Sequence, residues 1–498
     1  MTQTLRHLGA VSTDHRASPL CRSGFGPLLL LLLSLSVHAG DADLADAVES
    51  LDRPRIQQLL KASTELNASQ PDGMTALHWA VYHDDSALTR RLIKAGADVA
   101  ATNRYGVAAL SIACQNGGTE LVELLLAAGA DPNTSQRGGE TALMTAARTG
   151  KAGPVQALLK RGARVDAEER RGQTALLWAA AEGHADVVEM LLHAGANPRK
   201  TLPDSGFTAF FLAAREGRGE VVRVLLKAGI DVNEAMQPRK VTAKGPRKGT
   251  SALLLAIENG HFEVAVDLLK AGADPNDQRS GFTPLHALTW VRKPSRGEDD
   301  GDPTPLGSGR LNSLQFAQRL VDHGADVNAR LTQGKASPGS FARAGATPFL
   351  MAAATADTAY LRALVDWGAD PSLANNDGCT PLMVAAGIGV GSAAANEVAG
   401  TEPEVLEAIQ FLLDHGANVN AVDAHGETAM HGAAYKNLPQ VITWLADHGA
   451  SSAVWNRTNK YGWTPLAIAQ GHRPGNFKPS AETVDALQRV MRPRSSPP

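Results

Sequence analysis

The chain has 498 residues, of which 43% are hydrophobic, 20% charged and 5% aromatic, and its formal net charge is −3. This globular composition predicts that most of the chain buries a core, and the small net charge favours neither nucleic acid nor an acidic membrane surface as a partner. Few aromatics beside abundant Ala, Leu and Gly are typical of thin, repeated helical layers rather than of a large sheet enzyme.

Residues 1–39 have the pattern of a signal peptide. Three arginines precede the apolar run PLLLLLLSLSV at 27–37, which is shorter than the roughly 20 residues that a membrane span needs. Small residues at Val37 and Ala39 predict cleavage after Ala39, and hence a periplasmic or secreted protein without a membrane span. An uncleaved anchor or a buried helix is the alternative. The mature chain would keep Cys114 and Cys379, which we expect to be packed residues rather than a disulfide.

Residues 40–70 predict an N-terminal capping repeat, with two short helices within 41–60 and Pro54 at a helix start. Residues 71–456 then repeat with a period of 33. The period is set by Leu77, Leu110, Leu143 and Leu176, and the frame returns at Phe210, Leu253, Leu285, Phe349, Leu382, Met430 and Leu466. We call these positions the frame residues.

One unit, at 104–136, shows what each repeat contains. A glycine turn leads into a short apolar helix at 108–114, the sequence QNGG breaks it, and a second apolar helix ends at Gly129. Neither helix can cover its apolar face alone, so successive pairs must stack.

The unit DGMTALHWAVYHDDSALTRRLIKAGADVAA, beginning at Asp72, closely resembles the ankyrin repeat. The resemblance covers about residues 41–470 and implies an all-α solenoid of about 11 helix–turn–helix repeats plus capping repeats. It also implies that His78, His286 and His431 bond the turns. The whole array is similar to exported bacterial ankyrin-repeat proteins whose role is not established.

Residues 457–492 predict the final repeat and a C-terminal capping helix, and 493–498 a disordered tail. Four insertions rich in Gly, Pro or Ser interrupt the frame at 234–249, 291–310, 331–342 and 387–404. Long loops on a rigid scaffold often carry function, but tolerated surface slack explains them equally well.

No catalytic motif is present: we find no H-E-x-x-H, no C-x-x-C, no G-x-S-x-G and no phosphate-binding loop. Only His83, His425 and His472 of the mature chain lack a place in the repeat. The acidic run at 297–302 could collect calcium, but it lacks the spacing of an EF-hand and suits a solvated loop better. We therefore expect no enzyme, no metal and no cofactor.

The ankyrin resemblance implies that the turns and the ends of the first helices line one concave side. Arginine recurs there six residues before the frame residue, in a chain that is slightly acidic overall. The basic row comprises Arg104, Arg137, Arg170, Arg247, Arg279 and Arg343, with Arg171 and Lys248 beside it. Neighbouring aromatic candidates are Tyr105, Phe207, Phe282, Trp290, Tyr435 and Trp463. Arginine with exposed rings is typical of interface hot spots, whereas solvated turns and inward-facing rings are the alternative.

The sequence thus predicts a monomeric, rigid, non-catalytic scaffold that binds another protein with an acidic face, and no nucleic acid. Three alternatives remain open. The protein could be an accessory or protective factor for an exported enzyme, an enzyme with a site under the long loops, or a host-targeted effector or immunity protein.

Overall fold

The computed structural model describes residues 42–62, 65–241, 247–293, 309–334, 341–389, 400–472 and 479–492. These residues form helices and contain no strand of a sheet, only four isolated bridges at the turns. The first helices of the pairs are α2 (Asp43–Glu49), α4 (Ala76–Tyr82), α6 (Ala109–Asn116), α8 (Ala142–Thr149), α10 (Ala175–Glu182), α12 (Ala209–Arg215), α14 (Ala252–Glu258), α16 (Pro284–Arg292), α18 (Pro348–Ala354), α20 (Pro381–Ala386), α22 (Ala429–Lys436) and α25 (Pro465–Ala469). Their partners are α3 (Arg53–Lys61), α5 (Ser86–Ala95), α7 (Thr119–Ala127), α9 (Ala152–Lys160), α11 (Ala185–His193), α13 (Gly219–Lys227), α15 (Phe262–Lys270), α17 (Ser313–Asp322), α19 (Thr358–Asp366), α21 (Glu402–Asp414), α23 (Pro439–Asp447) and α26 (Ala481–Met491), and a short α24 (Ser452–Trp455) stands alone.

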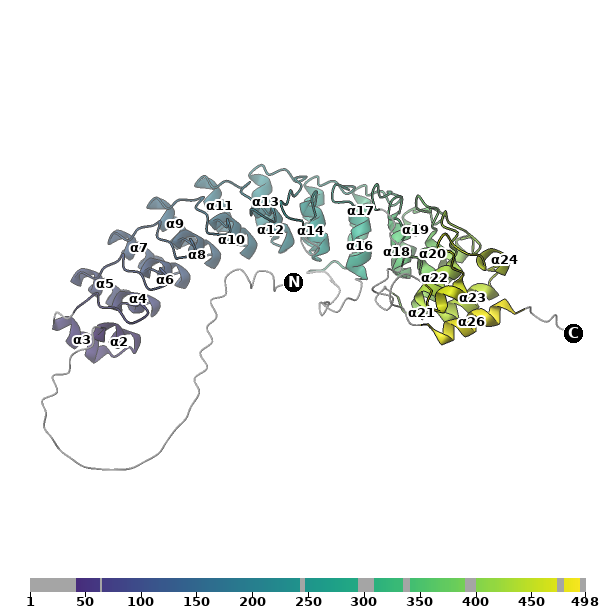
Figure 1. The fold of residues 1–498 in the computed structure, drawn as a ribbon. Helices are drawn as coiled ribbons and strands as arrows, with labels where there is room; N and C mark the ends of the chain where they lie inside the picture. The colour runs from purple at the N-terminus through teal and green to yellow at the C-terminus, as the bar shows by residue number, and fades with distance from the viewer. Residues whose placement is uncertain are drawn as a thin grey trace, which may run out of the picture.

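The pairs stack side by side into an arch (Figure 1). In the N-terminal half the first helices, such as α6 and α8, lie on the inner side, and their partners α7 and α9 lie on the outer side. The core is a continuous layer of buried apolar residues running between the helices from Leu44 to Leu487. The predicted all-helical repeat array is confirmed. Among the described residues, no helix is long and apolar enough to cross a membrane.

The recurring Thr-Ala-Leu stretch forms the start of α4, α8 and α10. At Thr174 the hydroxyl accepts a hydrogen bond from the amide of Leu177 at 3.3 Å, which caps α10, while the frame residue Leu176 is buried. At the other end Gly183 takes a left-handed conformation with φ 92° and ends the helix. The same threonine cap, buried leucine and terminal glycine recur at the same spacing in α8, at Thr141, Leu143 and Gly150.

The three turn-slot histidines bond one repeat to the next, as the resemblance implied. The Nδ1 of His78 lies 2.8 Å from the Thr75 hydroxyl, and its Nε2 lies 3.1 Å from the carbonyl oxygen of Val107 in the following repeat. Burial lowers the pKa of His286 and of His431 to about 4, so both rings are neutral at neutral pH.

Successive turns are also joined through the backbone. The amide of Arg104 donates to the carbonyl of Asp72 at 2.8 Å, and the amide of Arg137 donates to that of Tyr105 at 3.0 Å. The amide of Arg170 continues the ladder to Gly138 at 3.0 Å. Because these bonds use only backbone groups, they set the spacing of the turn tips independently of the side chains.

Several sequence predictions fall outside the described residues. These are the leader 1–39, the tail 493–498 and parts of the four insertions, of which 242–246, 294–308, 335–340 and 390–399 are not described. The boundaries of the leader and of the caps stay predictions. Within the described part, Cys114 and Cys379 are buried free thiols, as expected.

Candidate partner-binding surface

The N-terminal part of the basic row is exposed. Arg104, Arg137 and Arg170 stand at the tips of three consecutive turns, and among the described residues none of them forms an ion pair. The Nη2 of Arg170 donates to the carbonyl of Arg137 at 3.3 Å, and the guanidinium of Arg104 lies 4.9 Å from the ring centroid of Tyr105. The Tyr105 side chain is itself 56% exposed. These four residues form what we call the turn row.

The C-terminal members of the basic row differ from this picture. Arg279 is paired with Asp277, with Nε 2.8 Å from the carboxylate, and it also donates to the Asn233 carbonyl. Arg247 is half-buried and pairs with Glu258. Neighbouring carboxylates therefore neutralise these two arginines, and the prediction of one continuous basic row is corrected. Arg171 and Lys248 are exposed beside the row, as predicted.

Two of the aromatic candidates are buried. Phe207 is 5% exposed and lies under the guanidinium of Arg215 at 4.5 Å, because the residue three before each frame residue turns inward. Tyr435 is 6% exposed, and its hydroxyl donates to Glu427 at 2.8 Å. The expectation of exposed rings is wrong at these two positions. Trp463 is half-buried and stacks on Tyr461.

Phe282 and Trp290 form a half-buried cluster with two arginines. The two rings meet edge to face at 4.9 Å. The guanidinium groups of Arg247 and Arg343 lie 5.5 and 5.7 Å from the Phe282 centroid. Because both rings are half-buried and contact arginines of the neighbouring repeats, the contribution of this cluster to a binding surface is secondary.

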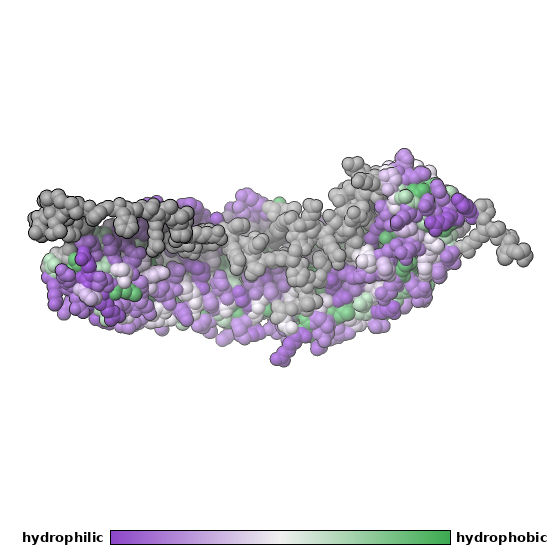
Figure 2. All heavy atoms as spheres, turned by 90° about the horizontal axis from the view of Figure 1, so that it is seen from below, coloured by the Kyte–Doolittle hydropathy of each residue, from purple (hydrophilic) through white to green (hydrophobic). Residues whose placement is uncertain are grey.

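The view from below in Figure 2 shows which chemistry the described surface offers. Hydrophilic residues dominate the visible part, and hydrophobic residues appear as small separate patches among them. A partner on this face would therefore meet charged and polar groups rather than a continuous apolar groove.

An ion pair joins the start of the insertion at 291–310 to the end of the insertion at 387–404. Lys293, at the end of α16, places its Nζ 3.0 Å from the carboxylate of Glu404 at the start of α21. Beside it, Arg292 forms a bidentate pair with Asp357 at 2.7 and 3.0 Å, and both side chains are largely buried. These contacts hold the described ends of the insertions at 291–310 and 387–404 close together.

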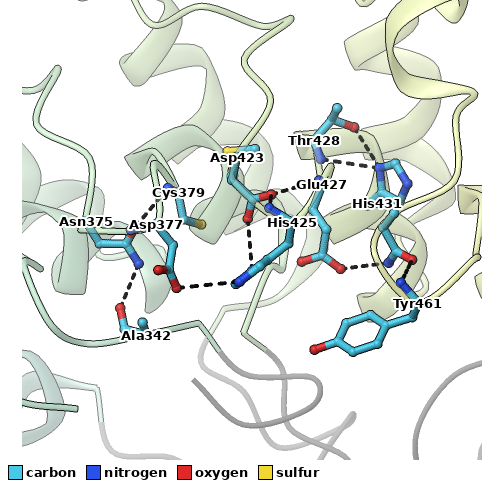
Figure 3. Close-up of polar contacts among 12 residues, drawn as sticks. Ala342, Asn375, Asp377, Cys379, Asp423, His425, Glu427, Thr428, His431 and Tyr461 are labelled. Atoms are coloured by element: carbon cyan, nitrogen blue, oxygen red, sulfur yellow. Dashed lines mark hydrogen bonds and ion pairs between the residues drawn. The ribbon is translucent and has the colours of Figure 1, made fainter. Parts of the chain in front are cut away.

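A second polar group lies on the turns of α20 and α22 (Figure 3). His425 lies between two carboxylates, with Nε2 3.8 Å from Asp377 and Nδ1 3.7 Å from Asp423. Glu427 is buried nearby and accepts hydrogen bonds from Tyr435 and from the Asn459 amide. Burial raises the pKa of Asp423 and that of Glu427. The sequence search missed this group, although the spacing D-x-H-x-E on an extended turn was its signal.

Two grooves among the described residues offer little for catalysis. One lies between α21, α23 and α26 and is lined by Trp444, Asp447 and Arg489 among others. Another lies along α15 and α17, lined by Glu263 and His323. Neither holds a Ser or Cys nucleophile beside a base among its lining residues.

Comparison with known families agrees with this architecture. The profile described as ankyrin repeats in three copies matches residues 44–136, 110–202 and 397–478, and the single ankyrin-repeat profile matches 205–236 and 248–279. Together these matches cover more than half of the chain. The protein belongs to the ankyrin-repeat family. Ankyrin repeats mediate contacts between proteins, so protein binding is the general role of this array.

Curated ankyrin-repeat relatives are similar over part of their length. The Saccharomyces cerevisiae protein named probable 26S proteasome regulatory subunit p28 is 31% identical over 26% of this chain and 50% of its own. The mouse B-cell lymphoma 3 protein homolog is 32% identical over 34% of this chain and 40% of its own. The mouse RelA-associated inhibitor is 31% identical over 28% of this chain and 15% of its own. The chain thus spans at most half the length of these relatives.

Proposed function

We propose that this protein is an exported, non-catalytic scaffold that binds another protein through the turn row. The observation that carries the proposal is the exposure of Arg104, Arg137 and Arg170 on consecutive turns without a neutralising carboxylate among the described residues. Tyr105 adds an exposed ring beside Arg104. Arginine and tyrosine are the residue types that dominate binding energy in interfaces.

The partner that fits this row carries carboxylates at the spacing of the repeats. Because the turn ladder fixes the tips before binding, association requires little ordering of the backbone. The protein would act as a monomer, and its affinity would fall as salt screens the charges. One relative, the mouse RelA-associated inhibitor, is by its name a protein that associates with another protein.

The partner is tested with matched charge reversals. We expect Arg104→Glu, Arg137→Glu and Arg170→Glu together to abolish cross-linking from a photoreactive residue at Tyr105. The control reverses three exposed basic residues away from the turn row, which changes the net charge equally: Arg91 and Lys94 on α5 and Arg161 at the C-terminal end of α9. If both triple variants lose the same cross-linked product, net charge rather than the turn row governs binding, and the proposal fails.

Export is the second element of the proposal, and it is supported by the apolar run at 27–37 followed by Val37 and Ala39. N-terminal sequencing of the protein from a periplasmic or culture fraction should find a chain beginning at Gly40. A chain that keeps residues 1–39 and stays with the cytosol would refute export while leaving the turn row untouched.

A further inference from the structure

The turns that precede α20 and α22 lie next to each other, and equivalent positions of the two turns carry different polar side chains. Asp377 and His425 occupy the same slot in successive turns, and Cys379 and Glu427 occupy another, two residues further on. The amide of Ala424 donates to the carbonyl of Asp377 at 2.8 Å, which fixes the register of the two turns. Side chains from distant parts of the sequence therefore meet at one place.

His425 and Glu427, together with Asp423 on the same turn, offer ligand atoms at close range. One atom each from Asp423, His425 and Glu427 can be chosen so that all lie within 4.8 Å of one another. The Oδ1 of Asp423 already accepts the turn amides of His425 and Glu427, each at 2.8 Å. The Oε1 of Glu427 accepts from Tyr435 and Asn459. These bonds hold both carboxylates in place and leave the second oxygen of each for another ligand.

A buried thiol points into the same group, and this is an observation independent of the acids. Cys379 is 1% exposed, and its sulfur makes no hydrogen bond to any residue in the described part of the chain. Figure 3 shows its side chain directed toward Asp423. Burial, and then the charges of Asp423, Glu427 and Asp377, raise the pKa of this thiol. In this inward-facing slot other turns place Met74, Phe207 or Ala346, whereas here a thiol, which can ligate a metal, lies beside carboxylates.

We propose that Cys379, Asp423, His425 and Glu427 form a binding site for a divalent cation of the zinc class, with Asp377 orienting His425. Sulfur, imidazole and carboxylate together are the ligand types that zinc prefers. Zinc-binding histidines commonly bond a carboxylate through their other nitrogen, and here Nε2 faces Asp377 at 3.8 Å.

Binding requires a modest contraction. Tetrahedral zinc places its ligand atoms roughly 3.4 Å apart, so the atoms of Asp423, His425 and Glu427, which lie within 4.8 Å of one another, must approach by up to about 1.4 Å. The Cys379 sulfur lies outside that group of three and must move closer as well. The side chain of His425 is 22% exposed and that of Asp423 only 2%, so the imidazole is the group with more freedom to rotate toward the cation. The cation would displace the thiol proton of Cys379 to solvent and form the zinc–sulfur bond, so uptake releases a proton. This site would link adjacent repeats and does not depend on the turn row.

The test is metal binding by the full, folded chain after chelator treatment. We expect titration calorimetry with Zn²⁺ to show one equivalent bound, and Co²⁺ to give a near-ultraviolet thiolate-to-metal band. Asp423→Asn should weaken Zn²⁺ binding at least about tenfold. This variant keeps the turn, since Asn375 and Asn459 fill the same slot and accept the same amide bonds in the neighbouring turns.

Two matched controls separate a site from adventitious binding. Cys379→Ser should remove the cobalt charge-transfer band, while Cys114→Ser, which changes the other buried thiol, should keep it. His425→Gln should weaken binding, while His83→Gln should not. The proposal is overturned if the folded wild-type chain binds much less than one equivalent. It is also overturned if the control variants lose the metal as fully as the site variants, provided that circular dichroism shows all of them folded.

Discussion

Replacing Arg292 by methionine should destabilise the repeats on both sides of the insertion at 291–310. The guanidinium makes two hydrogen bonds to Asp357 and one of 2.7 Å to the Ser313 hydroxyl, and the two charged side chains are only 13% and 4% exposed. Methionine fills a similar volume but leaves the carboxylate buried without its counter-charge. Breaking such a pair costs about 3–5 kcal/mol, because the remaining charge is not solvated.

Hydrogen exchange measured by mass spectrometry gives the clearest readout, since a repeat array can open locally. A loss of 3 kcal/mol raises the open population of peptides from α16 to α19 by about a hundredfold or more. Arg90→Met is the control, because Arg90 and Glu120 form an exposed pair whose side chains are 61% and 64% accessible. That change should cost no more than about 1 kcal/mol.

The double variant Arg292→Met with Asp357→Asn tests the reasoning directly. Asn at 357 can still cap α19 through the amide of Tyr360, which the aspartate now accepts at 3.1 Å. Removing both charges should therefore cost less than the sum of the single changes, by about 0.5–3 kcal/mol. An Arg292→Met variant as stable as Arg90→Met, or strict additivity in the double variant, would refute the buried-charge account.

Two further predictions concern the repeat itself. Thr174→Ala should destabilise α10 by about 0.5–2 kcal/mol in urea unfolding, whereas Thr174→Ser should be nearly neutral because serine keeps the capping oxygen. Burial lowers the pKa of His286 from 6.5 to about 4, so its contribution to stability is complete above pH 6.5 and is lost as the pH falls through 4. In His286→Gln the melting temperature should fall less steeply over that interval; an unchanged pH profile would count against a neutral buried ring.

The repeat architecture could be predicted from sequence because its determinants are local and recur. Leu176 is buried, Thr174 caps and Gly183 ends the helix in one short segment, and each neighbouring unit repeats these roles. The frame aligned His78, His286 and His431, and the ankyrin resemblance implied that they bond the turns; the bond from His78 to Val107 of the next repeat agrees with this.

The binding surface was predicted only in part. Whether a carboxylate lies beside a given arginine depends on the packing of neighbouring helices, which the spacing of the repeat does not reveal. Arg104 and Arg247 share one slot, yet Arg247 meets Glu258 at the end of α14 and Arg104 meets no carboxylate among the described residues. Phe207 was expected at the surface because it is aromatic and lies near the turn. Its slot in fact points beneath the first helix, as it does for Cys379.

The cluster around His425 was missed for a different reason. The segment D-x-H-x-E at 423–427 supplies three of the side chains but matches none of the metal motifs searched for, and Asp377 and Cys379 come from a turn on the other side of the insertion at 387–404. Once the frame is restored across the insertion, Cys379 and Glu427 align as equivalents, and their proximity follows from the stacking of the repeats.

The backbone ladder between turns has a consequence for how this protein can change over generations. The backbone amides of Arg104, Arg137 and Lys460 bond each turn to the one before it. The alignment of the repeats therefore does not depend on which side chain stands at the tip of a turn. Selection can therefore replace the residues at the tips one at a time, and acquire or lose a partner, without first repairing the scaffold that carries them.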